Sequence, residues 1–277
     1  MGEMSVRRKL AIASWEAPRE GNIYGKLTVD ATQAVAYIDW ARERTGEKVT
    51  ITHLVGRAVG EALKQTPSLN GRIAWGAYHP HETVDVSFLV VLEGGKNLAK
   101  AKIERIDEKS CADIAAEVRE LATRLREGRD DAFKKSQGPL AMLPTWIIRP
   151  LVHFTGWLTS SLGVEVGSLG LERYPFGSCI ITSVGMFGID EGFVPPTPWA
   201  RVPVYVLIGA ISERPAVVDS ELVVLPQLTI TATIDHRFID GFQGGVLAKV
   251  IRSVLENPWQ LEGMDGPPGT QSSSSEE

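Results

Sequence analysis

Cysteine is scarce in this chain, and its scarcity excludes a disulfide-stabilised fold. Among 277 residues there are two cysteines, Cys111 and Cys179, too few for the framework of a small secreted domain. The first residues also lack the apolar core of a signal peptide. We therefore expect a protein of the reducing cytoplasm, in which Cys179 is a buried packing residue and not a nucleophile.

Long apolar runs, basic clusters and internal repeats are missing as well. The most apolar stretch, 140–158, is interrupted by Pro144, Arg149 and Pro150, whereas a membrane-spanning helix needs roughly 20 nearly uninterrupted apolar residues. The net charge of -5 argues against nucleic-acid binding, which calls for a basic face. With 43% hydrophobic residues, the chain can form one large packed domain, and neither a membrane nor a nucleic acid is an expected partner.

One histidine lies where a strand pattern ends. Residues 228–234 alternate β-branched and small side chains, and His236 follows them before the turn signal Asp240-Gly241 and a helical apolar pattern over 246–255. A histidine held between two packed elements suits general-base chemistry, because its unperturbed pKa is about 6.5. Asp240 could orient the ring or form a buried ion pair that fixes the turn. The same spacing also fits a histidine without a catalytic role.

Two hydroxyls end another strand pattern upstream. Residues 176–183 are typical of a buried strand, and Thr182 and Ser183 close it before a glycine-rich turn from Gly185 to Gly188. Acyl transfer needs a base for the acceptor proton and a donor aimed at the oxygen that becomes negative. His236 fits the first role and a strand-end hydroxyl the second. The hydroxyls could instead only satisfy backbone groups at the strand end.

Together the two stretches resemble the catalytic domain of the dihydrolipoyl acyltransferases of 2-oxoacid dehydrogenase complexes and, more distantly, chloramphenicol acetyltransferase. The superfamily signature H-x-x-x-D-G is matched by His236, Asp240 and Gly241. The family's strand ending in Ser or Thr before a Gly-Met-Phe-Gly-like turn is matched by Thr182 and 185–188. The likeness extends over most of residues 6–260. It implies an α/β fold, a chloramphenicol acetyltransferase-like mixed-sheet sandwich.

The resemblance also implies roles for individual residues. His236 would deprotonate the acceptor, and Thr182, which aligns with the family's oxyanion-stabilising hydroxyl, would donate to the tetrahedral intermediate. Ser183 is the alternative donor, and we expect Ser183 and Gly185 to contact the substrate. In such proteins, the histidine of one subunit of a trimer meets the hydroxyl of its neighbour.

The aspartate of the signature is mainly structural in this family. The resemblance implies that Asp240 pairs with an arginine near the start of the domain, where Arg7 and Arg8 stand at a matching place. No metal is implied. His79 and His81 lack neighbouring ligands at metal-binding spacing, and we expect both to lie in a loop and face solvent.

The expected activity is CoA-dependent acyl transfer between a thioester and a thiol of the dihydrolipoyl type, or another acceptor. Acyl-CoA is then a substrate, and a lipoyl group acts only in trans, because the chain shows no lipoyl or subunit-binding domain of its own. We therefore expect a free homotrimer that is not part of a cage. Its partner would be a lipoyl protein, a carrier protein or a dehydrogenase. The alternative is a catalytically idle trimeric scaffold, or partner-binding subunit of a 2-oxoacid dehydrogenase-like assembly.

The chain divides into a flexible N-terminus (1–5), a catalytic domain (6–262) and a disordered tail (263–277), which is rich in serine. Within the domain, an apolar insertion at about 138–172 departs from the family. It could be a core or subunit-interface helix, a lid over an apolar acyl pocket, or a patch for a membrane surface or partner.

Hydrophobic spacing and breaker residues predict the remaining elements. Thr52 and Ser110 are the expected N-caps of two helices, and a turn is expected near Arg214-Pro215 and Asp219-Ser220. We expect strands at 25–31, 83–92, 98–103, 202–211 and 221–225, and helices at 34–44, 52–63 and 111–127.

Overall fold

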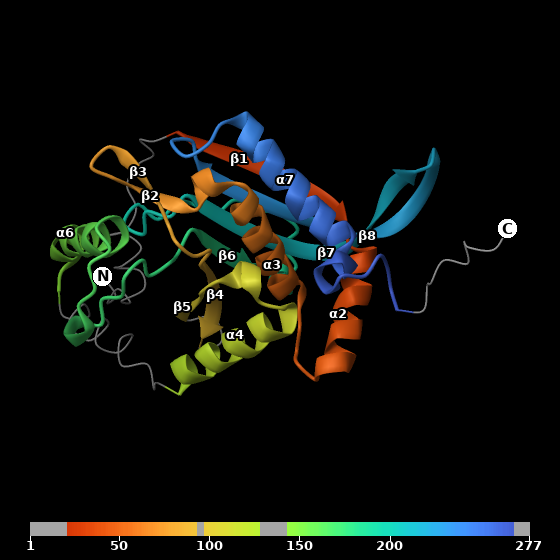
Figure 1. Ribbon diagram of the computed structural model, residues 1–277, viewed down its shortest axis with the longest axis horizontal. Coiled ribbons are helices and arrows are strands. Elements are labelled where there is room, and N and C mark those ends of the chain that lie inside the picture. Colours follow the sequence, from red (N-terminus) through yellow and green to blue (C-terminus); the bar gives the residue numbers. More distant parts are fainter. Residues whose placement is uncertain (1–20, 93–96, 128–142, 269–277) are drawn as a thin grey trace, which may run out of the picture.

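The computed structural model describes residues 21–92, 97–127 and 143–268, and Figure 1 shows a mixed sheet with helices packed on it. Arg7, Arg8, the expected flexible N-terminus and the tail from residue 269 lie outside the described residues. The α/β class with a mixed sheet is confirmed. The packed chain extends to Met264, which contacts the core and donates its backbone N–H to the carbonyl of Trp259.

The predicted elements occur in the expected order, but the strands at 71–74 and 77–80 were not predicted, and the patterns at 221–225 and 228–234 form one strand. The strands are β1 (Asn22–Asp30), β2 (Gly71–Ala74), β3 (Ala77–Pro80), β4 (Val86–Leu92), β5 (Asn97–Ile103), β6 (Cys179–Ser183), β7 (Val204–Val218) and β8 (Glu221–Asp235). The main helices are α2 (Thr32–Thr45), α3 (Ile51–Gln65), α4 (Cys111–Arg126), α6 (Thr145–Gly156) and α7 (Gly241–Glu256).

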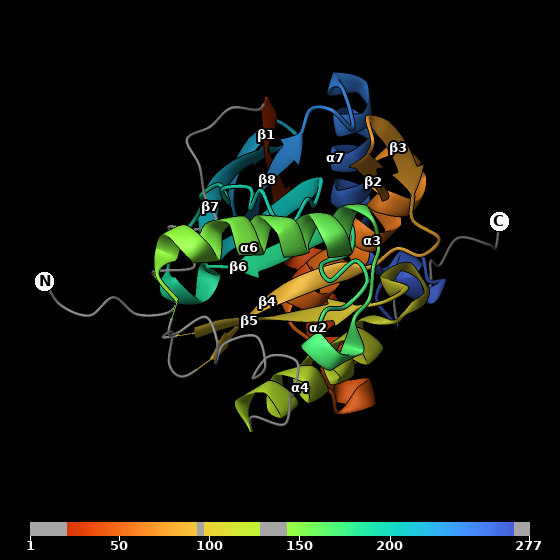
Figure 2. The ribbon, with the colours of Figure 1, turned by 90° about the vertical axis from the view of Figure 1, so that its left-hand side faces the viewer.

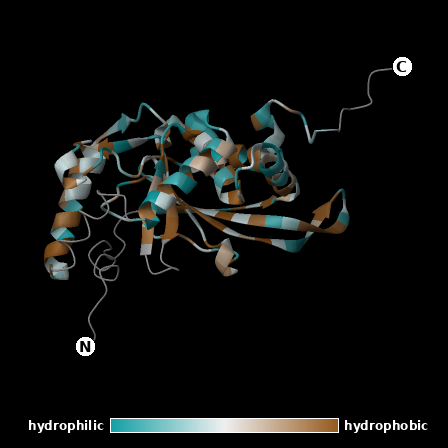
Figure 3. Ribbon diagram, turned by 90° about the horizontal axis from the view of Figure 1, so that it is seen from below, coloured by the Kyte–Doolittle hydropathy of each residue, from teal (hydrophilic) through white to brown (hydrophobic). Residues whose placement is uncertain are grey.

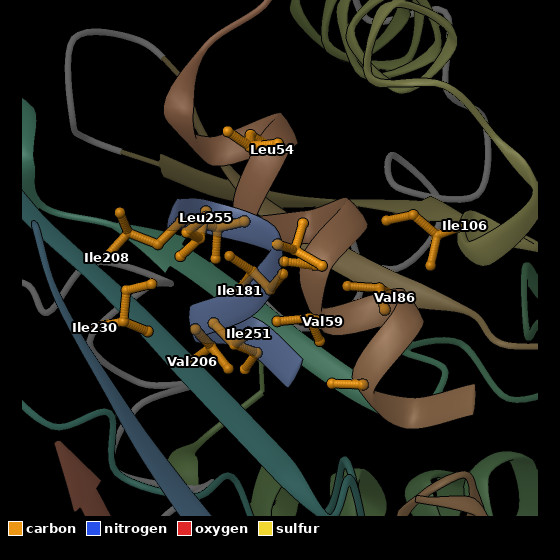
Figure 4. Close-up of a cluster of buried hydrophobic side chains, with 14 of the residues drawn as sticks. Leu54, Val59, Val86, Ile106, Ile181, Val206, Ile208, Ile230, Ile251 and Leu255 are labelled. Atoms are coloured by element: carbon orange, nitrogen blue, oxygen red, sulfur yellow. The ribbon is translucent and has the colours of Figure 1, made fainter. Parts of the chain in front are cut away.

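Six strands form one sheet in the order β1-β8-β7-β6-β4-β5, and β2 pairs with β3 in a separate hairpin. β6 runs parallel to both β4 and β7, while the other neighbours are antiparallel. The core lies between this sheet and the helices. Figure 4 shows how Ile181, Val206 and Ile230 of the strands meet side chains of α3 and α7, including Val59 and Ile251.

Because side chains alternate along a strand, the other face of the sheet carries a different set. Cys179 and Ile181 of β6 point into the helix-side core, whereas Ile180 belongs to a separate cluster with Tyr205 and Val202. Cys179 is buried as predicted, and burial raises the pKa of its thiol. By the same alternation, Thr182 lies on the face of the sheet opposite to α3 and α7.

The β7–β8 hairpin is longer than expected. The predicted turn at Arg214-Pro215 is wrong, because β7 continues through these residues, with Pro215 opposite Val224. The chain reverses only at Asp219 and Ser220, whose φ angles of 50° and 70° match the left-handed pair of a tight hairpin. A proline is tolerated at position 215 because the ribbon has open edges there.

The N-cap of α3 is Thr50, and the prediction of Thr52 is wrong. The backbone N–H of Thr50 donates to Nδ1 of His53 at 3.1 Å, which makes His53 the third-position partner of a capping box. The other predicted cap is confirmed, since Ser110 Oγ accepts from the backbone N–H of Asp113 at 3.2 Å.

His53 makes the stability of this fold sensitive to acid. Burial, with a smaller contribution from Arg42, lowers the pKa of His53 to about 4. The unfolded chain binds this proton at about pH 6.5, so the contribution to stability is complete above pH 6.5 and is lost as the pH falls towards 4. We expect His53→Gln, which keeps an acceptor for Thr50, to reduce the loss of unfolding free energy between pH 7.5 and 5 by about 2 kcal/mol in urea titrations. Equal losses in both proteins would contradict this assignment.

The apolar insertion forms α6, which packs through a narrow inner face. Ile148 and Val152 contact Trp199, and a Cβ at Gly156 would come within 2.1 Å of the Trp199 carbonyl oxygen. The outer face leaves Trp146 76% exposed and Phe154 57% exposed. α6 is therefore not part of the main core. Among the described helices, none has the length and apolarity that a bilayer span requires.

Candidate functional site

The turn that carries His236 is fixed by backbone contacts. Asp235 N–H donates to the carbonyl of Pro203 at 2.9 Å, and His236 N–H donates to the carbonyl of Gly21 at 3.2 Å. The ring nitrogen Nδ1 lies 2.6 Å from the Ile239 carbonyl oxygen. A carbonyl can only accept, so Nδ1 carries the proton and Nε2 keeps a free lone pair in the neutral ring. The exposed side chain therefore presents a base to its surroundings.

A second contact stabilises the same turn. The guanidinium of Arg237 forms a fork on the carboxylate of Asp235, with N–O distances of 2.6 and 3.0 Å, and the Arg237 backbone N–H donates to the same carboxylate at 2.9 Å. Bidentate pairs of this kind restrict geometry as well as adding energy. The end of β8 and the start of the histidine turn are thus held together.

Asp240 caps α7 and does not orient the histidine. Its Oδ1 accepts the backbone N–H of Phe242 at 2.9 Å, and its own N–H donates to Gln243 Oε1 at 3.0 Å. The interpretation in which the Asp240 carboxylate orients the His236 ring is wrong, because the Ile239 carbonyl does so. The Asp240 side chain is exposed in the part of the chain that the structure describes. The predicted pairing with Arg7 or Arg8 lies outside the described residues.

The strand-end hydroxyls are found where the sequence predicts them. Thr182 and Ser183 are the last residues of β6, both partly buried, and Gly185 opens the turn that follows. A Cβ at Gly185 would lie 2.6 Å from the carbonyl oxygen of Gly209, so only glycine allows this approach. The turn is therefore fixed against the irregular pairing that β7 makes with β8 after Ile208.

The strand register separates the hydroxyls from the histidine within one chain. Thr182 pairs with Leu207, Leu207 pairs with Thr231, and His236 lies five positions beyond Thr231 along β8 and its end. At a rise of about 3.3 Å per residue, the offset along the strands is about 16 Å, far beyond hydrogen-bonding reach. The chain thus brings His236 and Asp240 together at one end of the sheet, and Thr182, Ser183 and Gly185 towards the other.

A cavity of about 980 Å³ lies apart from these residues, between α4, α6, β5 and the segment 170–177. None of the predicted catalytic residues lines it. His81 lines the cavity, so the expectation that His81 faces solvent is wrong. Burial, with the nearby Arg72 guanidinium, lowers the pKa of His81 to about 4. His79 lies in β3 and not in a loop. No cluster of three metal-binding side chains occurs in the described ranges.

A family model described as the catalytic domain of 2-oxoacid dehydrogenases acyltransferase matches residues 12–135 and 164–262. The dihydrolipoyllysine-residue acetyltransferase component of the pyruvate dehydrogenase complex of Zymomonas mobilis is 26% identical over 76% of this chain and 38% of the relative. The succinyltransferase component of the 2-oxoglutarate dehydrogenase complex of Escherichia coli is 27% identical over 79% of this chain and 44% of the relative. The chain thus spans about two fifths of the length of these relatives.

Solved structures share the fold. A probable dihydrolipoamide acetyltransferase from Listeria monocytogenes superposes with a TM-score of 0.64 at 22% identity, over 86% of this chain and 85% of that one. The cubic core of the pyruvate dehydrogenase multienzyme complex gives 0.62 at 20% identity, over 93% and 87%. Chloramphenicol acetyltransferase gives 0.50 at 12% identity, over 91% and 96%. The expected chloramphenicol acetyltransferase-like sandwich is therefore confirmed.

Proposed function

Because this chain belongs to the family of 2-oxoacid dehydrogenase acyltransferase catalytic domains, we propose that it transfers an acyl group between the thioester of CoA and a thiol of the dihydrolipoyl type, or another acceptor. The observation that carries the proposal is the state of His236. Its Nδ1–H donates to the Ile239 carbonyl, which leaves Nε2 as an exposed base. The hydroxyl of Thr182 is the proposed oxyanion donor.

The reaction follows from these two groups. His236 Nε2 takes the proton of the acceptor thiol, and the thiolate attacks the thioester carbonyl carbon. The carbonyl oxygen becomes negative, and the Thr182 hydroxyl donates to it. The intermediate then expels CoA thiolate, which recovers the proton from His236. The Ile239 carbonyl keeps the ring oriented throughout, because it accepts from Nδ1–H in both the neutral and the protonated ring.

The site needs two subunits. Since the register separates Thr182 from His236 within one chain, His236 of one subunit would act with Thr182 of a neighbour. A homotrimer, as the family resemblance implies, provides three such sites. The acyl groups would come from acyl-CoA, or from a lipoyl or carrier protein in trans. In the second case, a dehydrogenase partner would load the acyl group onto that protein.

The β7–β8 ribbon supports self-association. Beyond Ile211 the two strands extend away from the sheet (Figures 1 and 3), with Val217 directly opposite Leu222 and Pro215 opposite Val224. These side chains share one face, where Leu222 is 77%, Val217 72% and Val224 66% exposed. An exposed apolar ribbon with open edges is a surface that another chain normally covers.

Placing a charge on this ribbon is expected to dissociate the assembly. Leu222→Glu would bury a carboxylate against apolar side chains of the neighbour, so the mass by light scattering should fall to that of a monomer, with loss of acyl transfer. Glu221→Lys, one residue away on the opposite face, should leave the mass unchanged. A Leu222→Glu protein of unaltered mass would show that this face is not an interface.

The activity itself is tested by thiol release from a panel of acyl-CoAs, from acetyl to long-chain, with dihydrolipoamide as acceptor. We expect acceptor-dependent release of CoA, and the preferred chain length identifies the acyl group. The absence of both turnover and acyl-CoA binding would favour the alternative function, a trimeric scaffold or partner-binding subunit. The exposed outer face of α6 is the observation that favours that alternative.

A further inference from the structure

The cavity beside α6 has an apolar wall and a charged side on which Arg72 lies. Figure 2 shows α6 on one side and α4 on the other, with β4 and β5 between them. The apolar wall comes from α4, α6 and the segments that follow α6: Leu121, Leu125, Val152, Gly156, Leu171, Phe176 and Trp199. Val152 and Gly156 of this wall fall in the stretch 136–163 that the family match leaves out, as do the lining residues Thr155 and Thr159. The family model therefore does not cover this part of the wall.

Arg72 is the polar residue that most clearly requires a partner. Its Nε–H donates to the carbonyl of Ser161 at 2.8 Å, and its guanidinium lies over the ring of Tyr174, 4.8 Å from the centroid. These contacts fix the plane of the guanidinium but use only one of its five N–H groups. Among the residues that the structure describes, no carboxylate forms an ion pair with Arg72.

Tyr174, on whose ring the Arg72 guanidinium stacks, has an unfavourable backbone conformation. Its φ of 45° is rare for an aromatic residue. The conformation is held by a hydrogen bond from its N–H to the Thr159 carbonyl at 3.3 Å and by Gly163, where a Cβ would lie 2.3 Å from the tyrosine hydroxyl. The guanidinium of Arg173 lies 4.9 Å from the same ring, and the His81 ring 4.6 Å. Strain of this kind concentrates at ligand-binding sites.

The other charges around the cavity are mostly balanced within it. Lys100 pairs with Glu172, and Lys102 pairs with Glu104 at 2.9 Å and with Asp85 at 3.8 Å. Glu82 and Glu165 also line the cavity. A hydrogen bond to Tyr174, with the nearby Glu82 and Glu165 carboxylates, raises the pKa of Arg173, so this guanidinium is already compensated. Arg72 is thus the guanidinium that remains available to a ligand.

We propose that this cavity binds an amphipathic anion, a carboxylate or phosphate on an apolar tail, whose oxygens accept from the free N–H groups of Arg72 while the tail lies along Leu125 and Val152. A planar guanidinium matches two oxygens of a carboxylate or phosphate. The apolar wall excludes water from the tail. This ligand site is separate from His236 and Thr182 and does not depend on the proposed acyl transfer.

Calorimetric titration of the full chain tests the proposal with four probes: decanoate, decyl phosphate, decanol and butyrate. We expect decanoate or decyl phosphate, which have both a charge and a tail, to bind. Decanol lacks the charge and butyrate lacks the long tail, so each should bind at least about tenfold more weakly. The tighter of decanoate and decyl phosphate identifies the head group. Equal affinity for decanoate, decyl phosphate and decanol, or no binding by any probe, would overturn the proposal.

Two variants locate the binding in this cavity. Arg72→Met keeps an unbranched side chain without the charge and should weaken binding of the preferred anion at least about tenfold. Arg252→Met, on the exposed side of α7, is the matched control and should bind as the wild type does. Thr155→Phe narrows the apolar wall and should also weaken binding. Thermal unfolding of each variant checks folding, and unchanged binding by a folded Arg72→Met protein would overturn the proposal.

Discussion

Replacing His236 with alanine is expected to lower the acyl-transfer rate about 10²- to 10⁴-fold, the usual contribution of a general base. The Nε2 lone pair is the group removed, because Nδ1–H already donates to the Ile239 carbonyl. The side chain is exposed, so the loss should appear in kcat without a change in thermal unfolding. The measurement is thiol release from acyl-CoA with dihydrolipoamide.

A second histidine serves as the control for this experiment. His79 lies in β3, and its ring contacts the Ala74 carbonyl. His79→Ala also removes an imidazole, but His79 lies outside the proposed acyl-transfer site. The rate of this variant should therefore stay within about threefold of wild type. A His236→Ala protein as active as His79→Ala would remove His236 from the mechanism.

Sequence periodicity was sufficient for most of the fold, because alternation and helical spacing report which face of an element is buried. The errors have physical causes. Thr50 and Thr52 both carry a capping hydroxyl, and only the backbone geometry selects Thr50, with His53 as its partner. Arg214-Pro215 resembles a turn, yet the ribbon accommodates the proline at an open edge.

The candidate site was predictable in its side chains but not in its supporting contacts. The histidine and the hydroxyls follow from strand ends and a family signature, whereas the group that orients His236 is a backbone carbonyl at Ile239, which has no sequence signal. The separation of Thr182 from His236 is a property of register across three strands. Neither spacing nor composition reports it.

Replacing Thr182 with valine is expected to lower the rate about 10²- to 10³-fold, because one oxyanion donor is lost. Valine keeps the β-branched shape that suits the end of β6. Ser183 points to the opposite face of the same strand, so Ser183→Ala should have a much smaller effect. Equal losses in the two variants would mean that the donor has not been identified.

Mixing the two inactive variants decides whether the site lies between subunits. In trimers assembled from equal amounts of His236→Ala and Thr182→Val chains, a site is complete where a chain with an intact histidine meets a neighbour with an intact hydroxyl, which occurs at about one quarter of the interfaces if assembly is random. Co-expressed chains with different tags should therefore recover about a quarter of wild-type activity. Thr182→Val mixed with the double variant is the matched control and should stay inactive, because no chain then carries the hydroxyl. If the first mixture is as inactive as the control, His236 and Thr182 do not complement each other across subunits, and the register that separates them within one chain leaves them no shared site.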